Sequence, residues 1–220
     1  MKRSIREIGL RAVILVIGLM IAHLGVTLFL IADLGSDPFN VLVQGIFSSM
    51  QKLTAWNLLT HGRVHICMCF IIIIVLLFVD RSYIKLGTVI CMILGGPIID
   101  LFMWLLSPAL SLITALPLKI FMLAIGCVIL AYGMTIVIKS DAGTGPNDLV
   151  GIVVSDKLHK KFSVTRIITD ALFVIIGFIL GGTFGLGTIV CVVLVGPTAG
   201  LFLPMNEKLV NKVMANILKR

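Results

Sequence analysis

Long apolar stretches alternate with short polar ones along the chain, and six of the apolar stretches approach the length that spans a membrane. A helix needs about 20 apolar residues to cross the hydrocarbon core of a bilayer. This pattern predicts six transmembrane helices, at 12–32, 64–79, 86–106, 119–138, 166–182 and 186–204. Two less apolar segments, 38–51 and 146–158, are predicted to be helices that either dip into the membrane or lie flat on it.

The pattern occurs twice. Residues 33–38 read DLGSDP and residues 141–146 read DAGTGP, an offset of 108 positions. Further along, residues 86–102 read LGTVICMILGGPIIDLF and residues 186–202 read LGTIVCVVLVGPTAGLF, an offset of 100. At the first offset Gly18 matches Gly126 and Gly25 matches Gly133. The chain therefore contains two copies of one unit.

Each copy contains three predicted spans, so the second copy must cross the membrane in the opposite sense to the first. The predicted fold class is an all-α membrane protein with two inverted three-helix repeats related by a pseudo-two-fold axis in the membrane plane. The predicted division is a basic N-terminus at 1–11, a first repeat at 12–106, an extracytoplasmic linker at 107–118, a second repeat at 119–204, and a basic tail at 205–220. The tail is predicted to be an amphipathic helix with Leu209, Val213 and Ile217 on its apolar face.

Composition supports the membrane prediction. The chain is 59% hydrophobic and only 13% charged, whereas a soluble domain is about 25% charged. The net charge of +8 does not indicate nucleic-acid binding, because with both termini in the cytoplasm 15 of the 18 Lys and Arg residues fall on the cytoplasmic side. That distribution predicts a multi-pass protein of the plasma membrane with its N- and C-termini inside.

Other classes of chemistry have little support in the sequence. All five cysteines lie in apolar runs, which indicates helix packing and not a disulfide framework. No cleavage site follows the first apolar run, so it is predicted to be a span and not a signal peptide. Without a P-loop, an HExxH motif or a nucleophile elbow, we expect neither an enzyme nor a bound metal or cofactor.

The two matching turns are the first candidate site. Gly35 and Gly143 permit a sharp turn, and Pro38 and Pro146 suit the first position of the helix that follows. Ser36 or Asp37 could cap the first of these helices, and Thr144 or Gly145 the second. The free N–H groups at such helix starts can also hold an anion. Simple capping and contact with a substrate or ion both remain open.

A second candidate is the pair of breaks within spans, at Gly96-Pro97 and Gly196-Pro197. Proline removes a backbone hydrogen bond and bends a helix. Paired breaks in two repeats point to a transporter's midplane site, but glycines there could equally serve close helix packing.

Ionisable residues within the spans are the third candidate, because burying a charge in lipid costs about 2.5–3.5 kcal/mol or more. Asp100 follows Pro97 without an obvious partner, and Arg166 and Asp170 are four residues apart on one helix face. His23 lies midway along the first span, either as a packing residue or as part of a site. Asn40 and Asp148 are repeat mates on the first turns after Pro38 and Pro146, where capping and ligand contact are both possible.

These motifs resemble the YczE/YitT-type family of bacterial membrane proteins. The resemblance rests on LGSDPFNVLVQGI and GGPIIDLF in the first half and on GTGPNDLV, SVTRIITDALFVIIGFILGGTFGLGT and VGP in the second. It implies that Pro146, Asp148 and Arg166 belong to the family's motif, and that Asp170 and Asp100 occupy usually acidic positions. Two residues depart from the pattern, since Phe39 replaces a frequent Trp and Asn40 a frequent Asp. The family implies a bacterial plasma membrane but brings no substrate.

The function predicted from the sequence is a small-solute secondary transporter with its site between the repeats. The alternative is a non-transporting scaffold or accessory subunit of another complex. The expected partners are the lipid bilayer and a small solute or ion, with a second copy or another membrane protein as further possibilities, and no nucleic acid.

Overall fold

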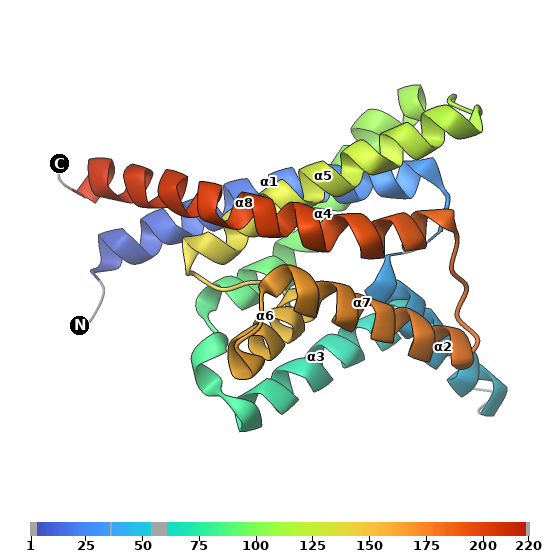
Figure 1. Ribbon diagram of the computed structural model, residues 1–220, viewed down its shortest axis with the longest axis horizontal. Helices are drawn as coiled ribbons and strands as arrows, with labels where there is room; N and C mark the ends of the chain where they lie inside the picture. Colours follow the sequence, from blue (N-terminus) through green and yellow to red (C-terminus); the bar gives the residue numbers. More distant parts are fainter. Residues whose placement is uncertain (1–3, 36, 54–60, 219–220) are drawn as a thin grey trace.

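The computed structural model describes residues 4–35, 37–53 and 61–218, and regular structure in these ranges is helical, as predicted. The helices are α1 (Ile5–Ala32), α2 (Pro38–Leu53), α3 (His61–Val79), α4 (Leu86–Leu110), α5 (Leu116–Ser140), α6 (Pro146–Leu158), α7 (Phe162–Ile179) and α8 (Leu186–Leu218), with a 3-10 turn, η1 (Arg81–Tyr83), after α3. Within the described ranges five helices, α1, α4, α5, α7 and α8, are long and apolar enough to cross a membrane, while α3 is apolar but shorter. Figure 1 shows the start of α1 and the end of α8 at the same end of the bundle.

Several helices are longer than predicted. Helix α1 starts at Ile5 because the Ser4 hydroxyl caps it, accepting a hydrogen bond from the Glu7 N–H at 3.1 Å. Helix α4 runs on to Leu110, so only residues 111–115 separate it from α5 where a longer linker was predicted. Helix α7 instead begins earlier and ends at Ile179, three residues before the predicted limit of 182.

The C-terminal tail is not a separate helix but the continuation of α8, which passes through Pro197 and Pro204. Leu209 and Ile217, which belong to the apolar face predicted for the tail, are exposed. The buried residues are Asn206, Val210 and Met214, on an adjacent face. The Asn206 amide donates to the Thr135 hydroxyl at 2.7 Å, a contact that ties this part of α8 to α5.

Helices α1 and α5 cross at the centre of the molecule through four glycines that are repeat mates. A Cβ added at Gly25 would lie 2.4 Å from the Gly126 carbonyl oxygen, and one added at Gly133 would lie 2.6 Å from that of Gly18. Reciprocal backbone contacts of this kind allow the two helices to approach closely. In Figure 1 the two helices run along each other, with α8 beside them.

Each matching turn packs on the other half of the chain. The Gly187 N–H, at the start of α8, donates to the Leu34 carbonyl at 2.8 Å, and the Gly87 N–H, at the start of α4, donates to the Ala142 carbonyl at 2.8 Å. Gly35 and Gly143 have φ values of 134° and 135°, which only glycine adopts readily. The sharp turns predicted at these two glycines are therefore confirmed.

The short helices α2 and α6 lie along longer helices of the opposite half. The start of α2 lies beside the middle of α7, where the Phe39 and Phe173 rings are 5.6 Å apart, and Ser49 near its end donates to the Leu180 carbonyl at 2.7 Å. Similarly, Leu149 of α6 packs against Leu76 of α3. Each short helix thus begins part-way along its neighbour and does not lie flat across the end of the bundle.

A polar contact ties the end of α6 to the turn after α3. Tyr83 donates to Asp156 at 2.9 Å, and Lys157 pairs with Asp80 at 3.6 Å. Hydrogen bonds from Ser82, assisted by the charge of Lys157, hold the pKa of Asp80 below its usual value. These contacts fix the C-terminal end of α6 and leave its N-terminal end pointing into the bundle.

Candidate functional site

The polar centre of the molecule is an ion cluster of Asp148, Arg166 and Asp170. The Arg166 guanidinium donates from Nε to Asp170 at 2.8 Å and from Nη1 to Asp148 at 2.7 Å. Arg166 is 8% exposed and Asp170 is 1% exposed, so the charges are held in the interior. The structure thus joins the predicted Arg166–Asp170 pair to Asp148 of the other candidate group.

A tight hairpin of α6 and α7 places these side chains. His159 ends α6 in the left-handed conformation, with φ 52°. Thr165 on α7 donates to the Gly151 carbonyl on α6 at 3.4 Å. Because Gly151 has no side chain, the Arg166 stem can lie against α6 and reach Asp148.

The first half of the chain holds an equivalent cluster with different charges. Asn40 is the third residue of α2 and His65 the fifth of α3, just as Asp148 is the third of α6 and Arg166 the fifth of α7. The His65 Nδ1–H donates to the Asn40 Oδ1 at 3.3 Å, which reproduces the Arg166–Asp148 contact. Cys69 then occupies the ninth position of α3, where α7 carries Asp170. The two clusters are built alike, but of the two only the second contains a permanently charged cation, Arg166.

His65 is one of the few ionisable residues within the predicted spans, but it was not included among the candidate site residues. Aligning the two repeats by their LGT motifs, which are 100 positions apart, does not match His65 with Arg166, because these two residues are 101 positions apart. Apolar residues on both sides of His65 offer no motif that marks this one-residue shift. The matching helix positions and hydrogen bonds reveal it.

Asp37 completes the first cluster. Its carboxylate accepts from the Asn40 N–H at 3.1 Å, so it caps α2, and it also accepts from the Asn40 side-chain amide. Capping by Asp37, one of the predicted alternatives, is therefore present, whereas Ser36 lies outside the described residues. Gly145 is the N-cap of α6 and provides no side-chain cap, and the buried Thr144 hydroxyl has no hydrogen-bond partner among the described residues. The Asp37 carboxylate also lies within electrostatic range of Asp170.

His23 reaches the same region from α1. Its Nδ1–H donates to the Leu19 carbonyl at 2.9 Å, and its other ring nitrogen, Nε2, faces Gly95. A Cβ on Gly95 would lie 3.0 Å from that nitrogen. In the second half the equivalents of His23 and Gly95 are Ala131 and Val195, both buried. The larger residue is therefore on α1 in the first half but on α8 in the second half. Asp148 is the acidic residue within electrostatic range of His23.

The paired helix breaks are packed differently in the two halves. Gly196 lets α8 approach α7, since a Cβ there would lie 2.8 Å from the Ser163 carbonyl oxygen, and Gly200 likewise faces the Ser163 side chain. In contrast, Gly96 has open space beside it, and Pro97 and Asp100 are exposed. Gly196 therefore serves packing, and Pro197 itself is exposed. Asp100, expected to face the interior, is not brought into the ion cluster.

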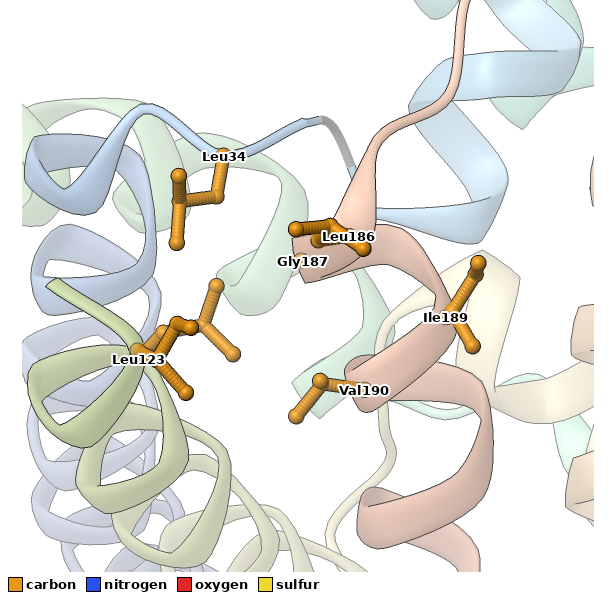
Figure 2. Close-up of a pocket in the computed structure, with 7 residues that line it drawn as sticks. Leu34, Leu123, Leu186, Gly187, Ile189 and Val190 are labelled. Atoms are coloured by element: carbon orange, nitrogen blue, oxygen red, sulfur yellow. The ribbon is translucent and has the colours of Figure 1, made fainter. Parts of the chain in front are cut away.

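Two pockets of about 150 and 200 Å³ lie at repeat-equivalent places. Figure 2 shows the first, where Leu34, Leu123 and the start of α8 enclose an apolar space. The second lies between the turn at Ala142 and the start of α4, and its lining includes Arg11, Lys85 and Asp141. Asp141 pairs with Lys85, and with Arg11 at 3.7 Å. One end of the bundle is thus tied by ion pairs, while the equivalent pocket is lined by apolar residues. No group of side chains in the described ranges could hold a metal ion.

The chain is similar to bacterial proteins along almost its whole length. The model of a family of unknown function, DUF6198, matches residues 9–204. The membrane protein YczE of Bacillus subtilis is 27% identical, covering 96% of this chain and 93% of its own length. YyaS of the same organism is 26% identical, over 87% of this chain and 92% of its own length. A protein of Haemophilus influenzae is also 26% identical, over 89% of this chain and 84% of its own length. No solved structure matches. The apolar helices, the family match and the likeness to YczE together make this chain an integral membrane protein of the DUF6198 family, of the YczE type.

Proposed function

We propose that the protein is a secondary transporter for a small solute or ion, with its site between two inverted repeats. The observation that carries the proposal is the ion cluster of Asp148, Arg166 and Asp170, buried where the starts of α2 and α6 converge. Buried charges in membrane proteins are costly and mark substrate or ion pathways. Discontinuous helices whose N-terminal ends point at a central site are typical of such carriers.

Charge balance favours a cation or a proton as one transported or coupled species. Asp148 and Asp170 share one fixed cation, Arg166, and a third acid, Asp37, lies within electrostatic range of Asp170. A low-dielectric interior does not tolerate unbalanced charge. Binding a cation, or protonating a carboxylate, would therefore reduce the net negative charge of the site and weaken the ion pairs of Arg166 with Asp148 and Asp170.

The unequal packing of the two halves supports alternating access. With both termini in the cytoplasm, the cytoplasmic half is closed by α7 on α8 at Gly196 and Gly200, and by the ion pairs of Asp141. The equivalent extracytoplasmic face of α4, at Gly96 and Asp100, is open. If the repeats exchange conformations, α3 packs onto α4 while α7 leaves α8, which moves access from one side to the other.

Disulfide cross-linking between equivalent positions tests this proposal. On a background without native cysteines, the pair Ser163→Cys and Gly200→Cys is expected to cross-link, because these positions are in contact. The pair Gly62→Cys and Asp100→Cys occupies the matching positions in the first half and should cross-link only in the second conformation. We expect both pairs to form disulfides in membranes, and neither single-cysteine control to do so.

A different result would support the alternative of a non-transporting partner protein. That reading is favoured by the exposed face of α4 with Asp100, a lipid-facing acid that could pair with a cation on another chain. If the first-half pair never cross-links under any ion gradient or pH, the repeats do not exchange and the transporter proposal is wrong.

A further inference from the structure

The two clusters described above differ in one chemical respect. In the second half the basic group is a guanidinium, which is always charged, and its partner is a carboxylate. In the first half the basic group is the His65 imidazole, a group that can be either neutral or charged, and its partner is the neutral Asn40. The same architecture therefore holds a permanent charge on one side and a switchable charge on the other.

The hydrogen bonds around His65 are arranged for an imidazolium. The Asn40 amide donates to the Asp37 carboxylate, which turns the amide oxygen toward His65. A proton added to the ring is thus connected through Asn40 to a carboxylate, and the neutral and charged rings both keep the Nδ1–H donor that this contact uses. The proton adds to Nε2, so no existing bond of the Asn40 contact is broken.

Among the described residues, groups from α2, α4 and α7 lie around His65. Helix α2 contributes Asp37 and Asn40 and the Phe39 ring, which lies 5.3 Å from the imidazole. Beyond that ring lies Phe173 of α7, and Met92 of α4 and Cys69 of α3 pack in the same cluster. Asp170 of α7 is the next acid inward, within range of Asp37.

We propose that His65, held by Asn40 and Asp37, is the site at which a proton binds to drive closure of α3 onto α4. The inference rests on the proposed transport function and specifies its coupling ion. When His65 is protonated, the first half acquires the charged arrangement that the second half has permanently, and the second half is the one in which α7 packs on α8. Deprotonation returns the first half to the open arrangement, so the proton gradient sets the direction of the cycle.

Spin labels at Cys67 and at Leu101→Cys, both exposed positions, report the separation of α3 and α4 in a protein whose other cysteines are replaced. In lipid nanodiscs we expect a short-distance population that grows as the sample pH falls from 8.0 to 5.5, by at most about tenfold per pH unit for one proton. His65→Gln should remain at the long distance at both pH values. Asn40→Asp combined with His65→Arg copies the second half, so its short-distance population should not change between pH 8.0 and 5.5.

Three results would overturn the proposal in distinguishable ways. A pH response that survives in His65→Gln means that another group binds the proton, while transport itself can stand. Exchange that occurs but is indifferent to pH excludes the proton as the driving ion. If no exchange is seen, nitrogen NMR of ¹⁵N-histidine in a protein that retains His65 alone still decides the matter, because a ring that does not titrate between pH 5 and 8 excludes the role proposed here.

Discussion

At the residue scale, one guanidinium pairs with two acidic side chains in the interior. Arg166 bridges Asp148 on α6 and Asp170 on its own helix, at 2.7 and 2.8 Å. A buried ion pair adds little net stability compared with apolar residues, but breaking one leaves a charge without a partner. A need for stability therefore does not by itself account for the cluster, which agrees with the transport role proposed above.

A single and a double variant of the Arg166–Asp170 pair should therefore differ in their free energy of unfolding. Arg166→Met leaves the buried Asp170 without its partner and should lower the free energy of unfolding by about 3–5 kcal/mol. Adding Asp170→Leu removes the stranded charge, so the double variant should recover a clear part of that loss. Denaturant unfolding of the purified protein in detergent measures both. A double variant no more stable than the single one would show that the pair matters for packing and not for charge.

At the element scale, close helix contacts decide where the polar groups lie. The crossing of α1 and α5 depends on Gly18, Gly25, Gly126 and Gly133, and each of the four faces backbone of the other helix. This crossing brings the two turns within reach of α4 and α8. Because α2 and α6 follow directly from those turns, the crossing also positions the starts of both short helices.

A methyl group at this crossing should therefore be poorly tolerated. A Cβ on Gly133 would lie 2.2 Å from the Ala22 backbone nitrogen, so the helices must move apart. We expect Gly133→Ala to cost about 1–3 kcal/mol, as overpacked cores do, and to lower Tm. Gly9→Ala is the matched control, because nothing lies within 4 Å of its added Cβ. Equal Tm values for the two variants would contradict the close contact.

At the scale of the whole molecule, the charge pattern of the sequence predicts which end faces the cytoplasm. The start of α1 and the end of α8 lie at one end of the bundle (Figure 1), and the sequence assigns most basic residues to the side of the termini. The positive-inside rule therefore predicts that this end is cytoplasmic. The same end carries the ion pairs of Asp141 with Lys85 and Arg11.

Reporter fusions check this orientation. A fluorescent protein joined after Arg220 should fluoresce, because it folds in the cytoplasm, and alkaline phosphatase inserted after Leu112 should be active, because it folds outside. The reciprocal fusions serve as controls. Active phosphatase at the C-terminus would reverse the sidedness and would place the closed half of the bundle on the outer side.

Periodicity and repetition along the chain were enough to predict the helices, the two glycine turns and the pairing of motifs such as Gly87 with Gly187. These features depend on local physics: long apolar runs need lipid or burial, glycine permits positive φ, and proline begins helices. The Arg166–Asp170 contact was also predictable, since four-residue spacing places both on one helix face.

Only the tertiary structure decided which polar residues meet. Asp148 reaches Arg166 from another helix, His65 matches Arg166 through helix position, and Asp100 stays exposed although its sequence neighbours suggested the interior. The contact of Asn206 with Thr135 on α5 was likewise set by the tertiary structure. In a membrane protein apolar side chains suit both lipid and core, so hydrophobicity alone does not tell which face of a helix is buried. That choice depends on shape, on where small residues let backbones touch, and on which polar groups find partners across helices.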